Sequence, residues 1–271
     1  MDTEIKVHNH GFVRLVDSMP SSNLDNAVVQ SARVSYGQGT TTSRGDRGLI
    51  RYLMRHWHTT PFEMVEFKFH MKMPLFVARQ HMRHRMASIN EISARYSEMK
   101  DEFFVPEEFR CQATVNRQGS EGVVDNSDSV VEFLTEHNEH SHEQYRSLLT
   151  DDNVCREQAR MLLPQTMYTE FYWKINLHNL LQYLRLRMDS HAQEEIRDYA
   201  QAVYDLVSPH IPYTIEAFRD FRLNSITLTG PEITALQKGK TSIDNSPGED
   251  REFQEKVKRM NINPIQWGDM E

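Results

Sequence analysis

The residues best suited to chemistry lie between Arg79 and Arg95. Arginine binds phosphate oxygens through paired hydrogen bonds, whereas lysine offers only a point charge, and this stretch contains no lysine. A single acid, Glu91, opposes the basic residues, so the pattern predicts a site for a small phosphorylated ligand. A solvated basic helix face is the alternative. The basic residues are Arg79, His81, Arg83, His84, Arg85 and Arg95, and nearby neutral donors are Ser88, Asn90 and Ser93.

Two further arginine positions extend this pattern. Arg156 and Arg160 are one turn apart in a helix expected over 153–163, where like charges repel unless an anion or an acid such as Glu157 lies between them. Arg187 is at the end of an apolar helix expected over 177–188. A buried arginine requires a partner, so we expect an anionic or carbonyl group beside it, with snorkelling to solvent as the alternative.

Common metal and nucleotide motifs are missing from the chain. The 13 histidines match no metal signature, and Cys111 and Cys155 are too few for a four-cysteine zinc site or a disulfide framework. The segment Gly239–Thr241 resembles the end of a P-loop but lacks the earlier glycine, and there is no G-x-G-x-x-G. We therefore expect no metal site.

Two strand-then-helix units position these residues. Alternating apolar residues predict strands over 64–73 and 167–175, and the short mixed segment 11–19 also has strand character. Pro74 precedes a helix expected over 75–85. Ser190 and Gln193 indicate a capping box for a helix over 192–207. The fold class is α+β, with an antiparallel sheet packed against long helices. Shorter helices are expected over 26–35 and 49–57, and loops over 37–48 and 114–129.

Composition limits the class of protein. The chain has 271 residues, a net charge of −8 and 38% apolar residues, which suits one large or two small globular domains. An acidic chain is a poor general binder of nucleic acid, and no apolar run reaches the length of a membrane span. We expect a cytoplasmic protein. Residues 1–222 form the expected main domain, and 223–271 a partly flexible C-terminal extension, with 237–252 as a flexible tail.

The stretch Arg83–Ser97 also carries a family resemblance. Its R-H-R followed by seven residues and Ser93 resembles the signature of the flavin-dependent thymidylate synthases. The resemblance runs from about Gly11 to Arg222. Other matching segments are Ala32–Ser35, His58–Glu63, Phe76–Gln80 and Arg187–Gln193.

The resemblance implies an α/β homotetramer with active sites shared between subunits. It implies FAD bound without a Rossmann motif and methylation of dUMP to dTMP, with methylenetetrahydrofolate as carbon donor and NADPH as reductant. The implied FAD contacts are Thr60, Arg83, His84, Arg85, Glu91, Asn176, His178 and Gln182, with Ser35, His58 and Glu63 as secondary candidates. The implied dUMP contacts are Gln80, Arg83, Glu91, Ser93, Ala94, Arg95, Arg160 and Arg187.

Arg187 has a chemical reason to be catalytic under this resemblance. A cation beside the uracil ring stabilises the charge that develops as N3 loses its proton. Two other functions remain open from the residues themselves. One is a metal-dependent nucleotide phosphohydrolase, and the other is an RNA-binding module in which Tyr96 and Phe103 stack on bases.

Overall fold

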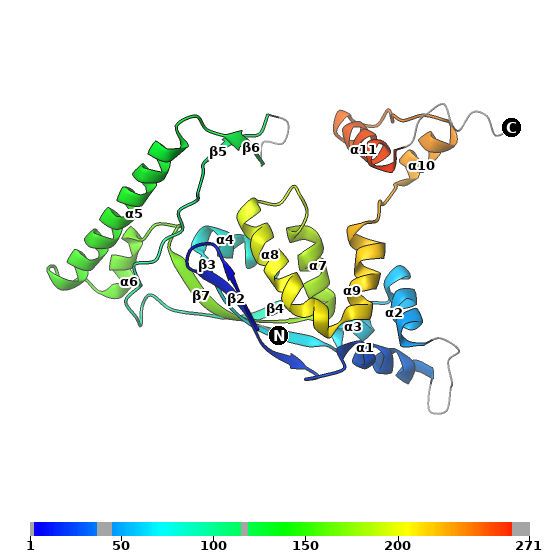
Figure 1. Ribbon diagram of the computed structural model, residues 1–271, viewed down its shortest axis with the longest axis horizontal. Coiled ribbons are helices and arrows are strands. Elements are labelled where there is room, and N and C mark those ends of the chain that lie inside the picture. Colours follow the sequence, from blue (N-terminus) through cyan, green and yellow to red (C-terminus); the bar gives the residue numbers. More distant parts are fainter. Residues whose placement is uncertain (1–2, 37–44, 115–118, 262–271) are drawn as a thin grey trace. The chain divides into compact units, whose positions relative to one another are not determined.

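The computed structural model describes residues 3–36, 45–114 and 119–261. The chain divides into two compact units, Met1–Phe218 and Arg219–Glu271. All of the site residues expected from the sequence lie in the first unit, which is an α+β structure (Figure 1).

A five-stranded antiparallel sheet organises the first unit, with strand order β1-β2-β3-β7-β4. Its two central strands are the alternating segments recognised in the sequence, and they pair along their full length from Glu66↔Asn176 to Pro74↔Tyr168. The strands are β1 (Glu4–Val7), β2 (Gly11–Met19), β3 (Glu66–Pro74), β4 (Ala87–Glu91) and β7 (Tyr168–Asn176).

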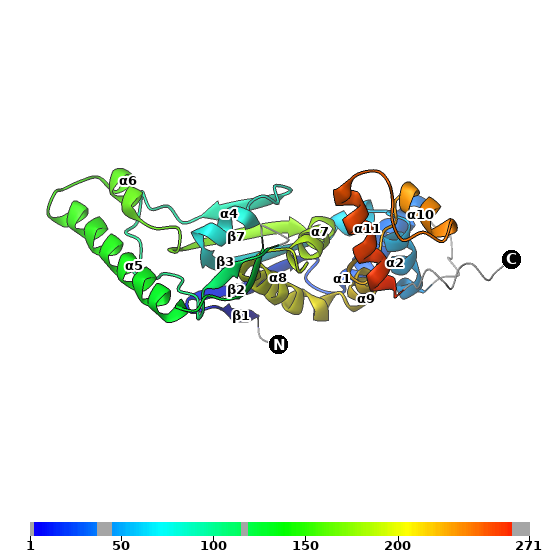
Figure 2. The same cartoon turned by 90° about the horizontal axis from the view of Figure 1, so that it is seen from above.

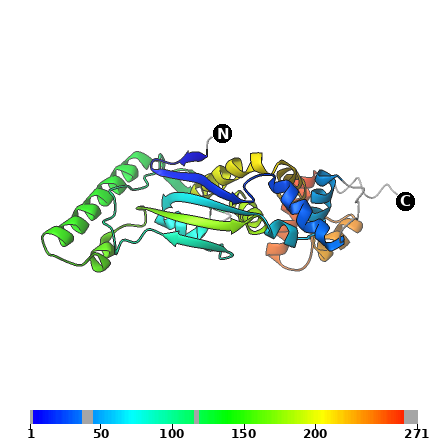
Figure 3. The same ribbon diagram turned by 90° about the horizontal axis from the view of Figure 1, so that it is seen from below.

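Helices α4 (Leu75–His81), α7 (Leu177–Arg187) and α8 (Glu194–Val207) cover one face of this sheet (Figures 1 and 2). The inward side chains of the central strands, including Phe69, Met71 and Trp173, are fully buried beneath them. The opposite face is seen from below in Figure 3, where the strands lie in front of these helices. Tyr172, which is half-exposed, belongs to that face. The alternation of apolar and polar side chains along these strands therefore determines which face of the sheet the helices cover, as the sequence predicts.

Smaller helices pack beside one end of the sheet. Asp25 in α1 accepts hydrogen bonds from the backbone nitrogens of Tyr213 (2.7 Å) and Thr214 (3.1 Å), which open α9. Arg51 in α2 pairs with Glu216 in α9 at 2.6 Å. These helices are α1 (Leu24–Arg33), α2 (Asp46–Arg55), α3 (Thr60–Glu63) and α9 (Pro212–Phe218).

A long helix, α5 (Ser127–Thr150), lies with α6 (Arg156–Ala159) beyond the other end of the sheet (Figure 1). Tyr145 in α5 accepts a hydrogen bond from the backbone nitrogen of Met99 at 3.3 Å. A small two-stranded sheet precedes α5, with strands β5 (Arg110–Gln112) and β6 (Ser120–Val123). The loop expected over 114–129 is therefore wrong at residues 120–123 and from Ser127 onward.

Three other expectations need correction. The helix expected over 75–85 ends at His81, and it is followed by β4, a strand that the sequence did not predict. Helix α8 begins at Glu194 without a side-chain cap, so the capping box is wrong, because the Gln193 side chain is hydrogen bonded to Gln80 and Glu195 instead. The loop expected over 37–48 lies mostly outside the described residues, and α2 already begins at Asp46.

The second unit contains helices α10 (Gly230–Gln237) and α11 (Pro247–Met260). Phe253 is fully buried against Ala235 and Val257, which gives this unit a small core of its own. Glu232 accepts hydrogen bonds from the backbone nitrogen of Thr229 (2.6 Å) and from Lys256 (2.8 Å). Within the range expected to be a flexible tail, 237–252, the residues from Pro247 onward belong to α11.

Candidate active site

Arg187 joins the end of α7 to the segment that follows α4. Its Nε donates a hydrogen bond to His84 Nε2 at 3.0 Å, and one Nη donates to the backbone oxygen of Gln80 at 3.1 Å. The carbonyl partner expected for Arg187 is thus confirmed. Residues more than 100 positions apart in the chain come together here because α4 and α7 follow neighbouring strands, β3 and β7, on the same face of the sheet.

The histidines beside Arg187 are held neutral. Burial, together with the charge of Arg187, lowers the pKa of His84 to about 4. Burial, with His84 and Arg187 acting in the same direction, lowers the pKa of the fully buried His81 to about 3. A neutral His84 can accept the hydrogen bond from Arg187. Arg187 therefore supplies positive charge to this part of the site without a charged histidine beside it.

Four packed rings lie beside Arg187. His81 lies against Trp173 with ring centroids 4.3 Å apart, and its Nδ1 is 3.2 Å from the Tyr183 hydroxyl oxygen. His84 meets the edge of Tyr183 at 4.9 Å, and burial raises the pKa of that phenol. The aromatic packing joins α4 and the residues after it to β7 and α7 beside Arg187.

A cavity of about 440 Å³ contains four of the residues expected to bind dUMP. Its size falls within the usual range for small-molecule sites, roughly 300–1,000 Å³. The Thr169 hydroxyl donates to Glu91 at 2.5 Å, which fixes one carboxylate oxygen. Apolar walls come from Leu75, Met99, Leu163 and Met167, and the expected ligand residues present are Glu91, Ser93, Ala94 and Arg160.

Cations border this cavity. Arg95 lies just after Ser93, whose hydroxyl accepts the Arg95 backbone N–H at 3.3 Å. Its guanidinium is 3.8 Å from Glu157, and Arg160 Nε donates to the Glu157 backbone oxygen at 3.3 Å. Glu157 thus lies beside Arg95, whereas the sequence left open whether it separates Arg156 from Arg160. Arg156 instead reaches Glu98 at 3.3 Å.

A second cavity, of about 870 Å³, contains three of the residues expected to bind the flavin: Ser35, His58 and Thr60. Tyr52, which the sequence did not single out, stacks on His58 with centroids 5.8 Å apart. Its position on α2 gives no signal by itself, because an aromatic residue in an apolar helix is usually a core residue.

Apart from Glu91, which lines the smaller cavity, the remaining expected flavin residues line neither of these two cavities. Arg83 and Arg85 are exposed, and within the described residues neither guanidinium pairs with a carboxylate. Asn176 caps α7, with its side-chain oxygen 2.9 Å from the Asn179 backbone nitrogen. His178 is half-buried and Gln182 exposed.

These residues fit a flavin dinucleotide chemically. Unpaired arginines suit the two phosphates, and the larger cavity offers hydroxyl groups and a stacked ring pair. In the described part of the chain, no group of three or more His, Cys, Asp or Glu is arranged to hold an ion. Among the described helices, none has the length and hydrophobicity that a bilayer crossing needs.

Similarity to known proteins agrees with this arrangement. Residues 14–213 match the family described as thymidylate synthase complementing protein. A flavin-dependent thymidylate synthase from Dictyostelium discoideum is 50% identical over 264 residues, which cover 94% of this chain and 86% of that protein. The enzyme of that name from Thermus thermophilus is 52% identical over 233 residues, covering 86% and 84%.

A solved structure is similar as well. The crystal structure of the UMP/dUMP methylase PolB from Streptomyces cacaoi, bound with 5-Br dUMP, matches with a TM-score of 0.72 and 36% identity. The match covers 81% of this chain and 99% of that chain. The family match, the two relatives and the shared fold lead to one conclusion: this chain belongs to the flavin-dependent thymidylate synthase family.

Proposed function

We propose that this chain converts dUMP to dTMP, with methylenetetrahydrofolate as the carbon donor and NADPH as the reductant. The chain is a flavin-dependent thymidylate synthase, a methyltransferase with FAD as its cofactor. The observation that carries the proposal is Arg187, held between His84 and the Gln80 carbonyl beside two neutral histidines. Such a guanidinium suits stabilisation of negative charge on a uracil ring.

The arginine-bordered cavity is the proposed site for the nucleotide. Ser93, Ala94, Arg95 and Arg160 surround the phosphate, with Ala94 contributing its backbone N–H. Glu91, oriented by Thr169, and Gln80 hold the nucleoside. Arg187 then meets the uracil, where its charge favours loss of the N3 proton and makes carbon 5 more nucleophilic. Arg83 is proposed to contact both dUMP and FAD.

FAD, when bound, supplies a hydride to the product-forming step. The proposed FAD contacts are Thr60, His58, Arg83, His84, Arg85, Glu91, Asn176, His178 and Gln182. His84 remains neutral and keeps Arg187 in place while its ring borders the cofactor. The exposed Arg83 and Arg85 line neither cavity of a single chain, which supports a homotetramer whose active sites are shared between subunits.

We further propose that residues 1–222 form the catalytic domain of a cytoplasmic enzyme and that 223–271 form a C-terminal extension. The metal-dependent phosphohydrolase is not supported, because the relatives that cover most of the chain are named flavin-dependent thymidylate synthases. An RNA-binding function is not supported either, for the same reason.

Anaerobic incubation with dUMP, methylenetetrahydrofolate and NADPH tests the proposal. With FAD added, product analysis should show dTMP and an equivalent amount of oxidised NADPH. Protein stripped of FAD should form none. Formation of deoxyuridine and inorganic phosphate in place of dTMP would overturn the proposal in favour of phosphate hydrolysis.

A further inference from the structure

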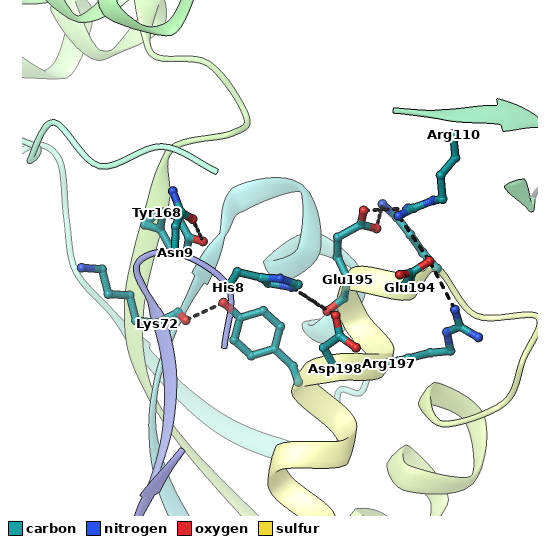
Figure 4. A network of polar contacts seen from close by, with 11 residues as sticks. His8, Asn9, Lys72, Arg110, Tyr168, Glu194, Glu195, Arg197 and Asp198 are labelled. Atoms are coloured by element: carbon teal, nitrogen blue, oxygen red, sulfur yellow. Dashed lines mark hydrogen bonds and ion pairs between the residues drawn. The ribbon is translucent and has the colours of Figure 1, made fainter. Parts of the chain in front are cut away.

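A chain of hydrogen bonds leads from the β5 strand to the side chain of Gln80. Arg110 Nη2 donates to Glu195 Oε1 at 2.7 Å, and Gln193 Nε2 donates to Glu195 Oε2 at 2.7 Å. Gln80 Nε2 in turn donates to Gln193 Oε1. Figure 4 shows the first link, with the Arg110 guanidinium directed at Glu195 at the start of α8.

The chemistry of Glu195 fixes the direction of every bond in this chain. Its side chain is buried. Burial raises the pKa of Glu195, but hydrogen bonds from Arg110, from its own backbone N–H and from Gln193, together with the charge of Arg110, outweigh burial and hold that pKa below its ordinary value. An ionised carboxylate only accepts hydrogen bonds. Gln193 must therefore turn its NH₂ group toward Glu195 and its oxygen toward Gln80.

The orientation of Gln193 in turn determines the orientation of the Gln80 side-chain amide. Its NH₂ group faces Gln193, to which one of its two N–H bonds donates, and among the described residues its Oε1 accepts no hydrogen bond. The Gln80 backbone is held as well, because Arg187 donates to its carbonyl oxygen at 3.1 Å. The amide of Gln80 thus turns its oxygen, an acceptor, away from Gln193, beside the residue proposed to meet the uracil.

We propose that Arg110, Glu195 and Gln193 are positioning residues that lock the Gln80 amide with its oxygen available to the substrate, so that this position selects a hydrogen-bond donor of dUMP. This inference rests on the proposed function. The donors of dUMP are the N3–H of the uracil and the 3′-hydroxyl. Gln80 therefore contacts the nucleoside and not the phosphate, whose oxygens act chiefly as acceptors.

Glu195→Gln tests whether Glu195 sets the orientation of the Gln80 amide, because an uncharged amide at 195 can turn either its oxygen or its NH₂ group toward Gln193. Calorimetric titration of the FAD-loaded enzyme with dUMP should show affinity weaker by about three- to tenfold, the size of one net hydrogen bond. FAD content should be unchanged.

Glu194→Gln is the matched control. Glu194 is next in the chain and also pairs with Arg110, at 3.3 Å, but it is exposed and forms no hydrogen bond to Gln193 within the described residues. Its dUMP affinity should equal that of the wild-type enzyme. If Glu195→Gln fails to fold, Gln193→Leu replaces it: this variant cuts the link to Gln80 and leaves the Arg110–Glu195 pair in place, and the same loss is expected.

Two analogues identify the donor. 3-Methyl-dUMP lacks the N3–H, and 2′,3′-dideoxyuridine monophosphate lacks the 3′-hydroxyl. The analogue that lacks the group bound by Gln80 should bind the wild-type enzyme more weakly than dUMP does, and this penalty should shrink in Glu195→Gln. Equal affinities of Glu195→Gln and Glu194→Gln for all three nucleotides would overturn the positioning role alone. Failure of the wild-type enzyme to bind dUMP would overturn the proposed function with it.

Discussion

At the scale of single residues, the site depends on which groups carry charge. Arg187 is charged, whereas burial keeps His81 and His84 neutral beside it. The sequence could predict that the arginine stretch binds an anion and that Arg187 needs a partner, since both follow from residue type. It could not predict the chain from Arg110 to Gln80, because those bonds join residues 85 and 113 positions apart.

Ser93 should affect the nucleotide more than the flavin. Ser93→Ala removes one hydroxyl donor to the phosphate, and a hydrogen bond to a charged group is worth about 1.5–3 kcal/mol. We expect dUMP affinity to fall at least about tenfold in titrations, with FAD affinity unchanged. Ser129→Ala, at an exposed position of α5, is the control and should leave both unchanged. Equal loss of both ligands in Ser93→Ala would indicate a general structural defect instead.

His81 should make the fold sensitive to acid. Its pKa of about 3 lies below that of an unfolded chain, about 6.5, so between these pH values the unfolded state binds more protons and the free energy of unfolding falls as pH falls. The slope for one histidine is at most about 1.4 kcal/mol per pH unit. Urea unfolding at pH 6 and pH 5 should show a flatter dependence in His81→Phe than in the wild-type protein. An unchanged slope would show that His81 does not cause the acid sensitivity.

At the scale of elements, hydrophobic periodicity decided what was predictable. Strands β3 and β7 follow from strict alternation of apolar side chains. Strand β4 does not, because it is an edge strand with almost all residues exposed and is defined by backbone pairing with β7. Helix α5 was missed as an element because much of its buried face is polar, including Asn138, Ser141 and His142.

Asn176 should matter to α7 as a cap. Loss of its hydrogen bond to the Asn179 backbone in Asn176→Ala should lower the free energy of unfolding by about 1 kcal/mol. Asn176→Asp retains an accepting oxygen and should stay within a few tenths of a kcal/mol of the wild-type protein. Urea unfolding measures both, and a similar loss in the two variants would rule out capping as the cause. FAD titration of the stable Asp variant then tests the proposed flavin contact separately.

At the scale of the whole chain, the proposed site lies in the first unit alone. None of its residues comes from Arg219–Glu271. Composition led to an interpretation of residues 237–252 as a flexible tail, because this segment is charged and contains Gly, Ser and Pro. The structure shows how few apolar residues suffice: Phe253 with Ala235 and Val257 supply the core between α10 and α11.

Phe253→Ala should loosen the second unit without removing activity. Truncation of a buried phenylalanine costs about 3–5 kcal/mol, which is large for so small a core. Limited proteolysis should cut residues 219–261 faster, while the KM for dUMP stays unchanged. The exposed Glu255→Ala is the control and should alter neither. Loss of dTMP formation in Phe253→Ala would assign the second unit a part in the site.

The role of Arg187 is tested most directly by anaerobic dTMP formation in Arg187→Ala and Arg187→Lys. The account predicts that Arg187→Ala retains FAD but forms no dTMP, because the charge beside the uracil is gone. Arg187→Lys should retain a small fraction of the activity, since a lysine keeps the charge without the fork that reaches both His84 and the Gln80 carbonyl. Full turnover by Arg187→Ala would contradict the account.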